Sequence, residues 1–209
     1  MAFKGLKKLL DRISSLFKKK GELKIGLYGP VNSGKTTLAN KICKDWLGED
    51  MGKASIVPHE TREIQTKENV KIERDGKSLT FNLVDTPGIA TRIDFEDFVK
   101  FGMGKKKAKS RAKEATKGVI ESIKWLDNMD MVLVVVDSTR DPLTQVNLTI
   151  LGNLDARGVP FLIVANKADL KQSQLKRVEE AFQNYRTVGI SARTGHRLEN
   201  LYDAVLETV

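Results

Sequence analysis

Hydrophobic residues in this chain gather in short continuous runs that alternate with amphipathic stretches. The runs at 131–136 and 159–164 hold almost no polar residues, and a strand has this pattern when both of its faces are buried, as in a parallel sheet. Between such runs, apolar residues recur at steps of three and four, which indicates helices packed on the sheet. The chain is therefore expected to form an α/β fold with a mostly parallel sheet and helices on both faces. The predicted strands are 22–28, 131–136, 159–164 and 186–190, and the predicted helices are 35–46, 143–156, 172–182 and 196–209.

Two other segments predict an antiparallel pair. Residues 67–73 and 78–84 alternate in character and flank Asp75-Gly76, a dipeptide that favours a tight hairpin turn. Residues 94–127 are predicted to be mostly helical, with a break around Gly102 and Gly104. The hairpin and this long helical segment interrupt the regular alternation of strand and helix.

Positive charge is concentrated in two segments. The 209 residues carry a formal net charge of +9, of which residues 1–20 contribute +6 and residues 100–117 contribute +7, so the remainder is −4. Segments of this kind suit an anionic partner such as RNA or anionic lipid. Residues 3–17 also place seven apolar side chains at helical spacing. We therefore predict a basic amphipathic helix over 1–20 and one domain over 21–209, with a basic helical insertion at about 94–118.

Composition narrows the class of protein. No apolar run reaches the ~18 residues of a membrane-spanning helix, and the single cysteine, Cys43, cannot form an internal disulfide. The basic N-terminus lacks the apolar core of a secretory signal. We expect a cytoplasmic protein, with a peripheral membrane location as the alternative. His59 and His196 lie far apart and have no cysteine partner, so no zinc site is expected.

A phosphate-binding loop is predicted between the first strand and helix 35–46. Residues 29–36 read GPVNSGKT, which satisfies G-x-x-x-x-G-K-[ST] in the strand–loop–helix context that the motif requires. Its glycines let backbone N–H groups surround phosphates at a helix N-terminus. Lys35 would neutralise the outer phosphates, and the Thr36 hydroxyl would ligate Mg2+. The predicted phosphate-binding residues are Asn32, Ser33, Gly34, Lys35, Thr36 and Thr37.

A second motif selects the base. Residues 166–169 read NKAD and follow the strand predicted at 159–164. A carboxylate at Asp169 can accept from two adjacent N–H donors on the edge of guanine. Adenine offers no such pair and would leave a buried charge unsatisfied. The ligand is therefore expected to be GTP or GDP.

Four more residues complete the predicted base site. Asn166 is expected to tie the NKAD loop to the phosphate-binding loop, and the stem of Lys167 is expected to cover one face of the base. The backbone of Ser191 and Ala192 is expected to approach the guanine carbonyl oxygen.

A third motif, DTPG at residues 85–88, stands at the end of the second hairpin strand. Asp85 can hold Mg2+ there through a water, and the Gly88 N–H can meet the terminal phosphate. Such a turn is common by itself. Its place between the phosphate-binding loop and NKAD favours a role as the sensor of the terminal phosphate.

These motifs, in this order, resemble the translation-factor-related P-loop GTPases, and DTPG followed by Ile89 is similar to the Era-like branch. The likeness covers residues 22–209, and we find in it no counterpart of the RNA-binding KH domain of Era. The resemblance implies a six-stranded sheet with one antiparallel edge strand and five helices. It also implies Mg2+-dependent GTP binding, GTP hydrolysis and two switch segments that order around the terminal phosphate.

In that family a threonine of the first switch completes the Mg2+ shell. Residues 58–63 read PHETRE and resemble the P-x-x-T-R segment of the family. Thr61 is therefore the expected metal ligand, with Thr66 as the second choice. The alternative is that both are ordinary loop hydroxyls.

Two positions bear on catalysis. Ile89 stands where Ras-like enzymes carry a water-orienting glutamine, and an aliphatic side chain cannot hydrogen-bond a nucleophile, so intrinsic turnover is expected to be slow. Asn32 matches the asparagine that coordinates K+ in potassium-activated relatives, which suggests K+ stimulation. The alternative is an asparagine that braces the first switch through a hydrogen bond. The expected catalytic residues are Lys35, Thr61, Gly88 and Asn32.

Three biological roles are open for the basic segments. In the first and favoured role, a ribosome or RNA assembly GTPase uses Lys105–Lys113 to contact phosphates. In the second, residues 3–17 lie on an anionic membrane surface. In the third, residues 3–17 pack on a protein partner or on their own domain. A nucleotide-binding module without turnover is a further alternative, and the oligomeric state is left open.

Overall fold

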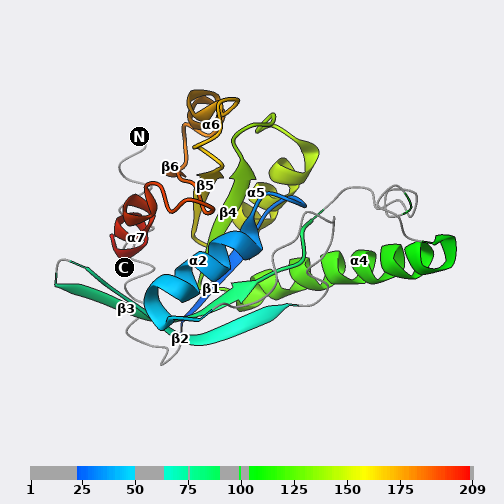
Figure 1. Ribbon diagram of the computed structural model, residues 1–209, viewed down its shortest axis with the longest axis horizontal. Helices are drawn as coiled ribbons and strands as arrows, with labels where there is room; N and C mark the ends of the chain where they lie inside the picture. The colour runs from blue at the N-terminus through cyan, green and yellow to red at the C-terminus, as the bar shows by residue number, and fades with distance from the viewer. Residues whose placement is uncertain (1–22, 50–63, 75, 90–98, 100–103, 208–209) are drawn as a thin grey trace.

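A six-stranded sheet forms the centre of the molecule (Figure 1). The computed structural model describes residues 23–49, 64–74, 76–89, 99 and 104–207. β2 runs antiparallel to β3, and the other pairings are parallel. This confirms the predicted α/β fold with its antiparallel edge strand. In spatial order the strands are β2 (Gln65–Arg74), β3 (Lys77–Asp85), β1 (Lys24–Tyr28), β4 (Met131–Asp137), β5 (Phe161–Asn166) and β6 (Thr187–Gly189).

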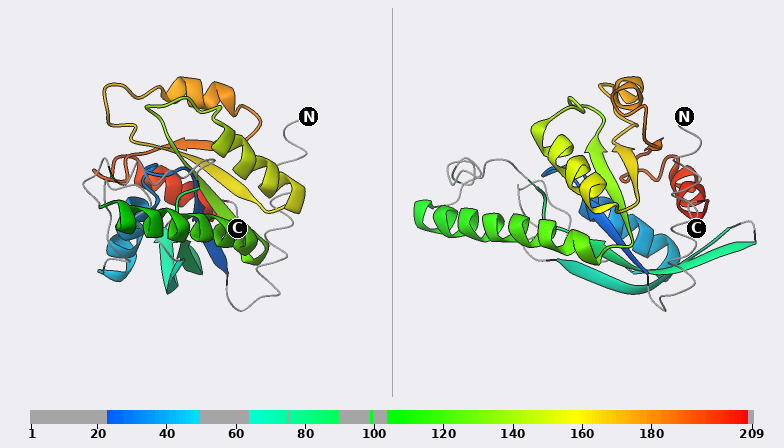
Figure 2. Two further views of the ribbon diagram at one scale, coloured as in Figure 1. Left: turned by 90° about the vertical axis from the view of Figure 1, so that its right-hand side faces the viewer. Right: turned by 180° about the vertical axis from the view of Figure 1, so that it is seen from behind.

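Helices cover both faces of the sheet, as Figure 2 shows from two further sides. On one face, α2 and α7 pack against the sheet. On the other face, α4, α5 and α6 close a second apolar cluster. None of the described helices is long and apolar enough to cross a membrane. The helices are α2 (Lys35–Leu47), α4 (Lys105–Trp125), α5 (Gln145–Arg157), α6 (Leu175–Ala181) and α7 (Leu198–Leu206), with a short 3₁₀ turn η1 (Leu126–Asn128).

The position of β4 between two layers of helices explains why its sequence is a continuous apolar run. Leu133 and Val135 belong to the cluster under α2 and α7, whereas Val132, Val134 and Val136 belong to the cluster under α4 to α6. Side chains of a strand alternate between its two faces. Because helices cover both faces, each position of β4 must be apolar.

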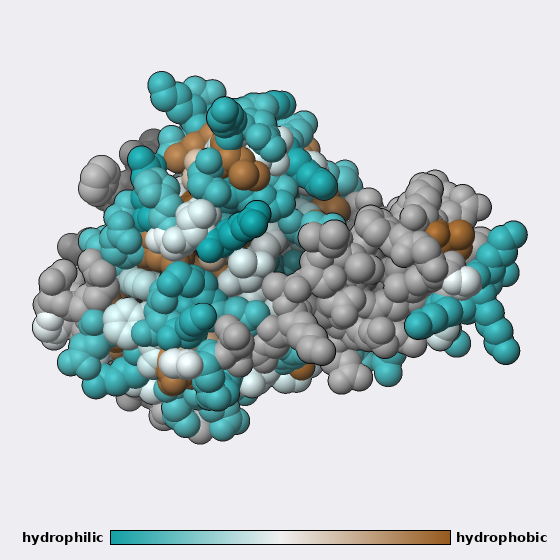
Figure 3. All heavy atoms as spheres, in the orientation of Figure 1, coloured by the Kyte–Doolittle hydropathy of each residue, from teal (hydrophilic) through white to brown (hydrophobic). Residues whose placement is uncertain are grey.

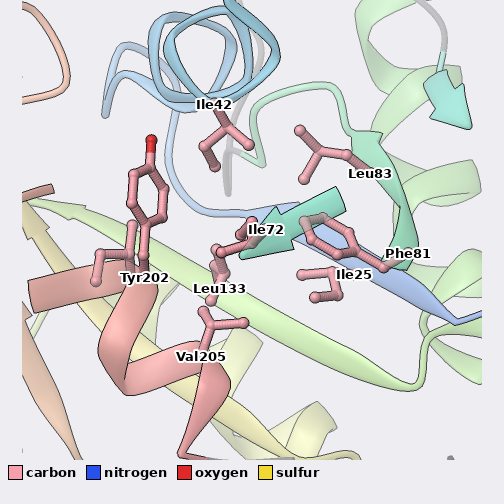
Figure 4. Close-up of a pocket in the computed structure, with 9 residues that line it drawn as sticks. Ile25, Ile42, Ile72, Phe81, Leu83, Leu133, Tyr202 and Val205 are labelled. Carbon is pink, nitrogen blue, oxygen red and sulfur yellow. The ribbon is translucent and has the colours of Figure 1, made fainter. Parts of the chain in front are cut away.

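A small cavity lies between α2, α7 and the sheet, and Figure 4 shows the side chains that line it. The lining is apolar apart from the hydroxyl of Tyr202, which donates to Asp45 Oδ2 at 2.9 Å. Such a lining cannot bind a charged nucleotide. The cavity therefore belongs to the core, and its lining residues are Ile25, Ile42, Ile72, Phe81, Leu83, Leu133, Leu201, Tyr202 and Val205.

Some boundaries differ from the prediction. The strand predicted at 159–164 is shifted to Phe161–Asn166, because α5 runs on to Arg157, Gly158 ends it with φ 62°, and β5 stays paired with β4 as far as Asn166. Trp125, the last residue of α4, is 36% exposed. The buried side of α4 near this end is instead occupied by Val119, Ile123 and Ser122.

Other predictions fall on residues that the structure does not describe. These are the N-terminal helix over 1–20, the switch threonine Thr61, and the first part of the segment expected to be helical at 94–127. Thr66, the second choice for the switch threonine, lies in β2, where it is exposed and paired in register with Val84.

Helix α4 is anchored to the sheet near its C-terminal end. The backbone N–H of Leu126 donates to the carbonyl of Ile123, three residues back, where the α-helix changes into η1. The carbonyl of Ser122 accepts from the hydroxyl of Tyr28 at 2.9 Å, in a buried contact. Burial, helped by the nearby charge of Asp127, raises the pKa of Tyr28, so its hydroxyl keeps the proton that it donates. The last residue of β1 thereby holds the helix.

Replacing Tyr28 by phenylalanine removes this hydrogen bond and leaves a buried carbonyl without its donor. We expect Tyr28→Phe to lower the free energy of unfolding by about 1 kcal/mol, which corresponds to roughly 2–4 °C in Tm for a domain of this size. Thermal and urea unfolding measure both quantities. Tyr202→Phe is the matched control and should cost less, because its acceptor Asp45 is exposed to water. Equal costs for the two variants would contradict the anchoring role of Tyr28.

Candidate functional site

The carboxyl ends of the parallel strands meet at one edge of the sheet. The phosphate-binding loop (29–36) follows β1, and the DTPG segment (85–88) begins at the last residue of β3. The NKAD segment (166–169) begins at the last residue of β5. The three motifs are therefore neighbours in space although they are far apart in the sequence, as the topology of an open α/β sheet requires.

The backbone of the phosphate-binding loop depends on two glycines. Gly29 has φ 155°, and a Cβ placed on it would lie 2.1 Å from the carbonyl oxygen of Val135. Gly34 has φ 97°, and its Cβ would lie 2.2 Å from the side-chain nitrogen of Asn166. No L side chain fits at either position. Gly34 also caps the N-terminus of α2 without a side-chain hydrogen bond, which leaves the helix N-terminus suited to an anion.

Lys35 lies folded back under this loop. Its Nζ donates to the carbonyl oxygens of Gly29 at 3.1 Å and Pro30 at 2.9 Å, and the residue is 5% exposed. Burial lowers the pKa of Lys35 to about 8, against the opposing attraction of Asp85. An anion in the loop would favour the charged amine and restore its ordinary titration.

Thr36 and Asp85 form the candidate Mg2+ site. The Thr36 hydroxyl donates to Asp85 Oδ2 at 2.7 Å, while Asp85 Oδ1 is buried with no hydrogen-bond partner. Burial raises the pKa of Asp85, although the Thr36 hydroxyl and the Lys35 charge partly offset this. An unsatisfied carboxylate oxygen beside a hydroxyl fits Mg2+, which is usually held by one or two carboxylates together with substrate phosphates.

Gly88 and Ile89 lie against the phosphate-binding loop. A Cβ on Gly88 would lie 2.8 Å from the Cα of Val31, so the two loops touch through backbone. The N–H of Ile89 donates to the Gly29 carbonyl at 3.1 Å. The side chain of Ile89 is 5% exposed and belongs to the apolar cluster under α4 to α6. The Ile89 side chain is therefore part of the core and offers no hydrogen bond.

The side-chain amide of Asn166 joins three loops. Its nitrogen donates to the Ser33 carbonyl at 2.9 Å. Its oxygen accepts from the backbone N–H groups of Lys167 at 2.8 Å and Ala192 at 2.9 Å. This is the link between NKAD and the phosphate-binding loop that the sequence analysis expects, and the loop after β6 is bound into the same network.

The other predicted base and phosphate residues lie around this network. Asp169 is exposed and Thr37 is half-buried. Ser191 is buried and its hydroxyl accepts from the Thr194 N–H at 3.1 Å. The Ser33 hydroxyl is buried without a hydrogen-bond partner. Asn32 is exposed and holds φ 62°.

Asp137, the last residue of β4, is a site residue that the sequence analysis missed. Its Oδ2 lies 2.5 Å from Lys167 Nζ, and Lys167 Nζ also donates to the Asn32 carbonyl at 2.8 Å. Burial raises the pKa of Asp137, but hydrogen bonds from Lys167 and Thr139 outweigh it and hold the pKa below its usual value. An acidic residue at the carboxyl end of a buried parallel strand was the available signal.

The chain is similar in sequence to known GTPases. The family described as 50S ribosome-binding GTPase matches residues 24–167. GTPase Der of Ruminiclostridium cellulolyticum is 28% identical over 218 residues, covering 96% of this chain and 44% of that protein. GTPase Der of Ruegeria pomeroyi is 31% identical over 194 residues, covering 88% of this chain and 35% of that protein. The chain thus spans less than half the length of these curated relatives.

Solved structures share the fold at low identity. Aquifex aeolicus Era bound to GDP.AlF4− has a TM-score of 0.67 at 21% identity, covering 89% of this chain and 56% of that one. Era in complex with MgGDPNP and a segment of 16S ribosomal RNA gives 0.67 at 20% identity, with 88% and 56% covered. A probable GTP-binding protein engB gives 0.55 at 20% identity, with 88% and 97% covered. The family match spans well over half of this sequence and includes the phosphate-binding loop and DTPG, so the chain belongs to the family of 50S ribosome-binding GTPases.

Proposed function

We propose that this chain binds GTP and GDP with Mg2+ and hydrolyses GTP slowly as a molecular switch. The observation that carries the proposal is the convergence of Lys35, Thr36 and Asp85 at a helix N-terminus, with one oxygen of Asp85 buried and unsatisfied. A nucleotide-binding module without turnover would not need all three of these residues to neutralise the charge that develops during hydrolysis. Steady-state phosphate release from GTP by the purified chain tests directly whether it hydrolyses GTP.

Each residue of the proposed site has a distinct task. The loop backbone and Lys35 surround the phosphates, and the Lys35 charge offsets the negative charge that develops on the leaving group. Thr36 and Asp85 would hold Mg2+, and the ion would supply further neutralisation of the phosphates. The Gly88 N–H meets the terminal phosphate. Thr61, outside the described residues, is proposed to complete the Mg2+ shell.

The proposed base site uses the loops after β5 and β6. Asp169 would accept from the two N–H donors of guanine, and the Lys167 stem would cover one face of the base. Asp137 and the Asn32 carbonyl hold the Lys167 amine, so the stem is fixed in place before a nucleotide arrives. Ser191 and Ala192 would present backbone to the guanine carbonyl oxygen.

For the biological role we propose a ribosome or RNA assembly GTPase in the cytoplasm. The family description and the likeness to GTPase Der support this choice, and the exposed lysines of Lys105–Lys113 at the free end of α4 offer a surface for phosphates. The membrane and protein-partner alternatives depend on residues 3–17, which lie outside the described residues. The observations on the described part of the chain therefore favour RNA.

Exchanging Asp169 for asparagine should change base preference. Xanthine carries a carbonyl where guanine carries its amino group, and an amide can donate to that carbonyl, whereas the carboxylate cannot. We expect Asp169→Asn to weaken GTP binding by roughly a hundredfold, about 3 kcal/mol, and to strengthen XTP binding. Competition against a fluorescent nucleotide measures both affinities. Unfolding curves should stay unchanged because Asp169 is exposed. Loss of GTP binding with no gain for XTP would argue against contact between Asp169 and the base.

Nucleotide binding should take up protons near pH 8. With a pKa of about 8, roughly half of the Lys35 amines are neutral at that pH in the nucleotide-free chain, and bound phosphates favour the charged form. Calorimetric titration with GDP in two buffers of different ionisation enthalpy measures the uptake, which should approach half a proton at pH 8 and rise to about nine tenths of a proton at pH 9, where the phosphates of GDP are fully ionised. Zero uptake at both pH values would mean that Lys35 is already charged before binding.

Asn32 provides a test of cation activation. If its side chain helps to hold a monovalent cation beside the phosphates, GTP turnover should be faster in KCl than in NaCl at equal ionic strength. Asn32→Gly, which accommodates φ 62°, should reduce the KCl rate to the NaCl rate. Equal rates of the unaltered chain in the two salts would remove the K+ hypothesis and leave Asn32 as a brace for the first switch.

A further inference from the structure

Four lysines of α4 line up along one side of the helix. At ~100° per residue, Lys106, Lys113, Lys117 and Lys124 fall within about 20° of a single line parallel to the helix axis. All four are exposed. At ~1.5 Å per residue, the line is about 27 Å long. We refer to these four residues as the lysine ridge.

The ridge lies opposite the face by which α4 is anchored. Val119 and Ile123 pack against the apolar cluster, and Ser122 is buried and bonded through its carbonyl to Tyr28. Val119 and Ser122 lie on the other side of the helix, at about 140° and 160° from the line of the ridge, and Ile123 lies at about 100° from it. The lysines therefore face solvent, and the pair Lys117 and Lys124 stands on a part of the helix that the core holds fixed.

The two ends of the ridge differ in their surroundings. Towards Lys106 the helix extends beyond the sheet (Figures 1 and 2), and hydrophilic residues gather at this free end on the right of Figure 3. Towards Lys124 the ridge lies over the body of the domain. A ligand held by the whole ridge would thus bridge the free end of α4 and the fixed end, which leads through η1 to the start of β4.

Charge along the ridge is poorly compensated within the described residues. Lys117 pairs with Glu121 at 3.8 Å, but both side chains are well exposed, at 78% and 44%, and such surface pairs contribute little. A straight row of exposed ammonium groups attracts a linear polyanion and releases its counterions. The row suits phosphates spaced along a nucleic acid strand.

The chemistry of the ridge distinguishes among polyanions. Lysine is a point charge that contacts phosphate without reading bases. Single strands are usually held by aromatic platforms, and Trp125, the aromatic residue of α4, lies about 100° away from the ridge. A membrane surface needs an apolar face beside the lysines. Val119 and Ile123 are engaged with the core, and Ile120, which is 51% exposed and lies about 40° from the ridge, is one side chain and does not form such a face.

We propose that the lysine ridge binds the phosphate backbone of double-helical RNA. This inference rests on the proposed ribosomal role, and it extends the contact surface from Lys105–Lys113 at the free end to Lys124 at the anchored end. Lys117 and Lys124 are the decisive residues, because they lie beyond Lys105–Lys113 and stand on the fixed part of α4. Rigid placement lowers the cost of ordering side chains on binding.

The test uses the double variant Lys117→Gln, Lys124→Gln and the matched double variant Lys44→Gln, Lys176→Gln. The control lysines are exposed on α2 and α6, away from the ridge. Filter binding of an RNA hairpin duplex is followed across a KCl series, with the full chain loaded with GDP or with a non-hydrolysable GTP analogue. The ridge variant should bind roughly thirtyfold more weakly at ~0.1 M salt, and its log–log salt slope should fall by roughly 1.5. The control should stay within about twofold. GDP affinity and Tm should be the same for all three proteins.

Other outcomes would overturn the inference in different ways. If the unaltered chain binds the duplex and the two double variants behave alike, the ridge is not the contact surface, although the ribosomal role stands. If the unaltered chain binds no RNA in either nucleotide state, the ribosomal role fails as well. If the ridge variant loses binding only to vesicles of phosphatidylcholine and phosphatidylglycerol, the occupant is lipid. An equal loss for a single strand of the same sequence would exclude duplex selection.

Discussion

The side-chain amide of Asn166 is the interaction on which the nucleotide site depends. One amide donates to the Ser33 carbonyl and accepts from the N–H groups of Lys167 and Ala192, so it fixes the loops after β1, β5 and β6 relative to one another. It is 3% exposed, and a buried amide with these partners tolerates little displacement. Gly34 must lack a side chain because this amide passes directly against it.

A second layer of contacts prepares the site electrostatically. Lys35 is buried against backbone carbonyls and Asp85 is buried beside it, so each charge is poorly solvated before a ligand arrives. Phosphate and Mg2+ are the species that would relieve this condition, since the first supplies negative charge to Lys35 and the second satisfies Asp85. Lys167, by contrast, is already paired with Asp137. The residues proposed to contact the base are therefore held by partners within the protein, whereas Lys35 and Asp85 lack such compensation.

The sheet connects this site to the basic helix. Tyr28, which precedes the phosphate-binding loop, has its hydroxyl bonded to α4, and the lysines of α4 face away from that contact. The chain between Gly88 and α4 also links the DTPG segment to the same helix through the sequence. Within the described residues, the lysines of α4 thereby stand on an element that is connected twice to the nucleotide site.

Much of the fold and of the site could be predicted from sequence. The runs in β4 and β5, the Asp75-Gly76 turn and the motifs beginning at Gly29, Asp85 and Asn166 are local patterns, and each follows from what a short stretch of chain can bury or bind. Element boundaries and the exposure of single side chains depend on tertiary contacts instead. β5 extends to Asn166 because β4 pairs with it there, and Trp125 is exposed because α4 turns another side to the core.

The sequence by itself determined the alternation of strands and helices, the phosphate and base motifs, and the two basic segments, because these are properties of neighbouring residues. The tertiary structure decided which partners meet: Asp137 with Lys167, Tyr28 with Ser122, and four lysines with solvent along one line of α4. Tertiary contacts in this fold join residues separated by as many as 157 positions. They are set by the packing of the sheet and its helices, which no local pattern specifies.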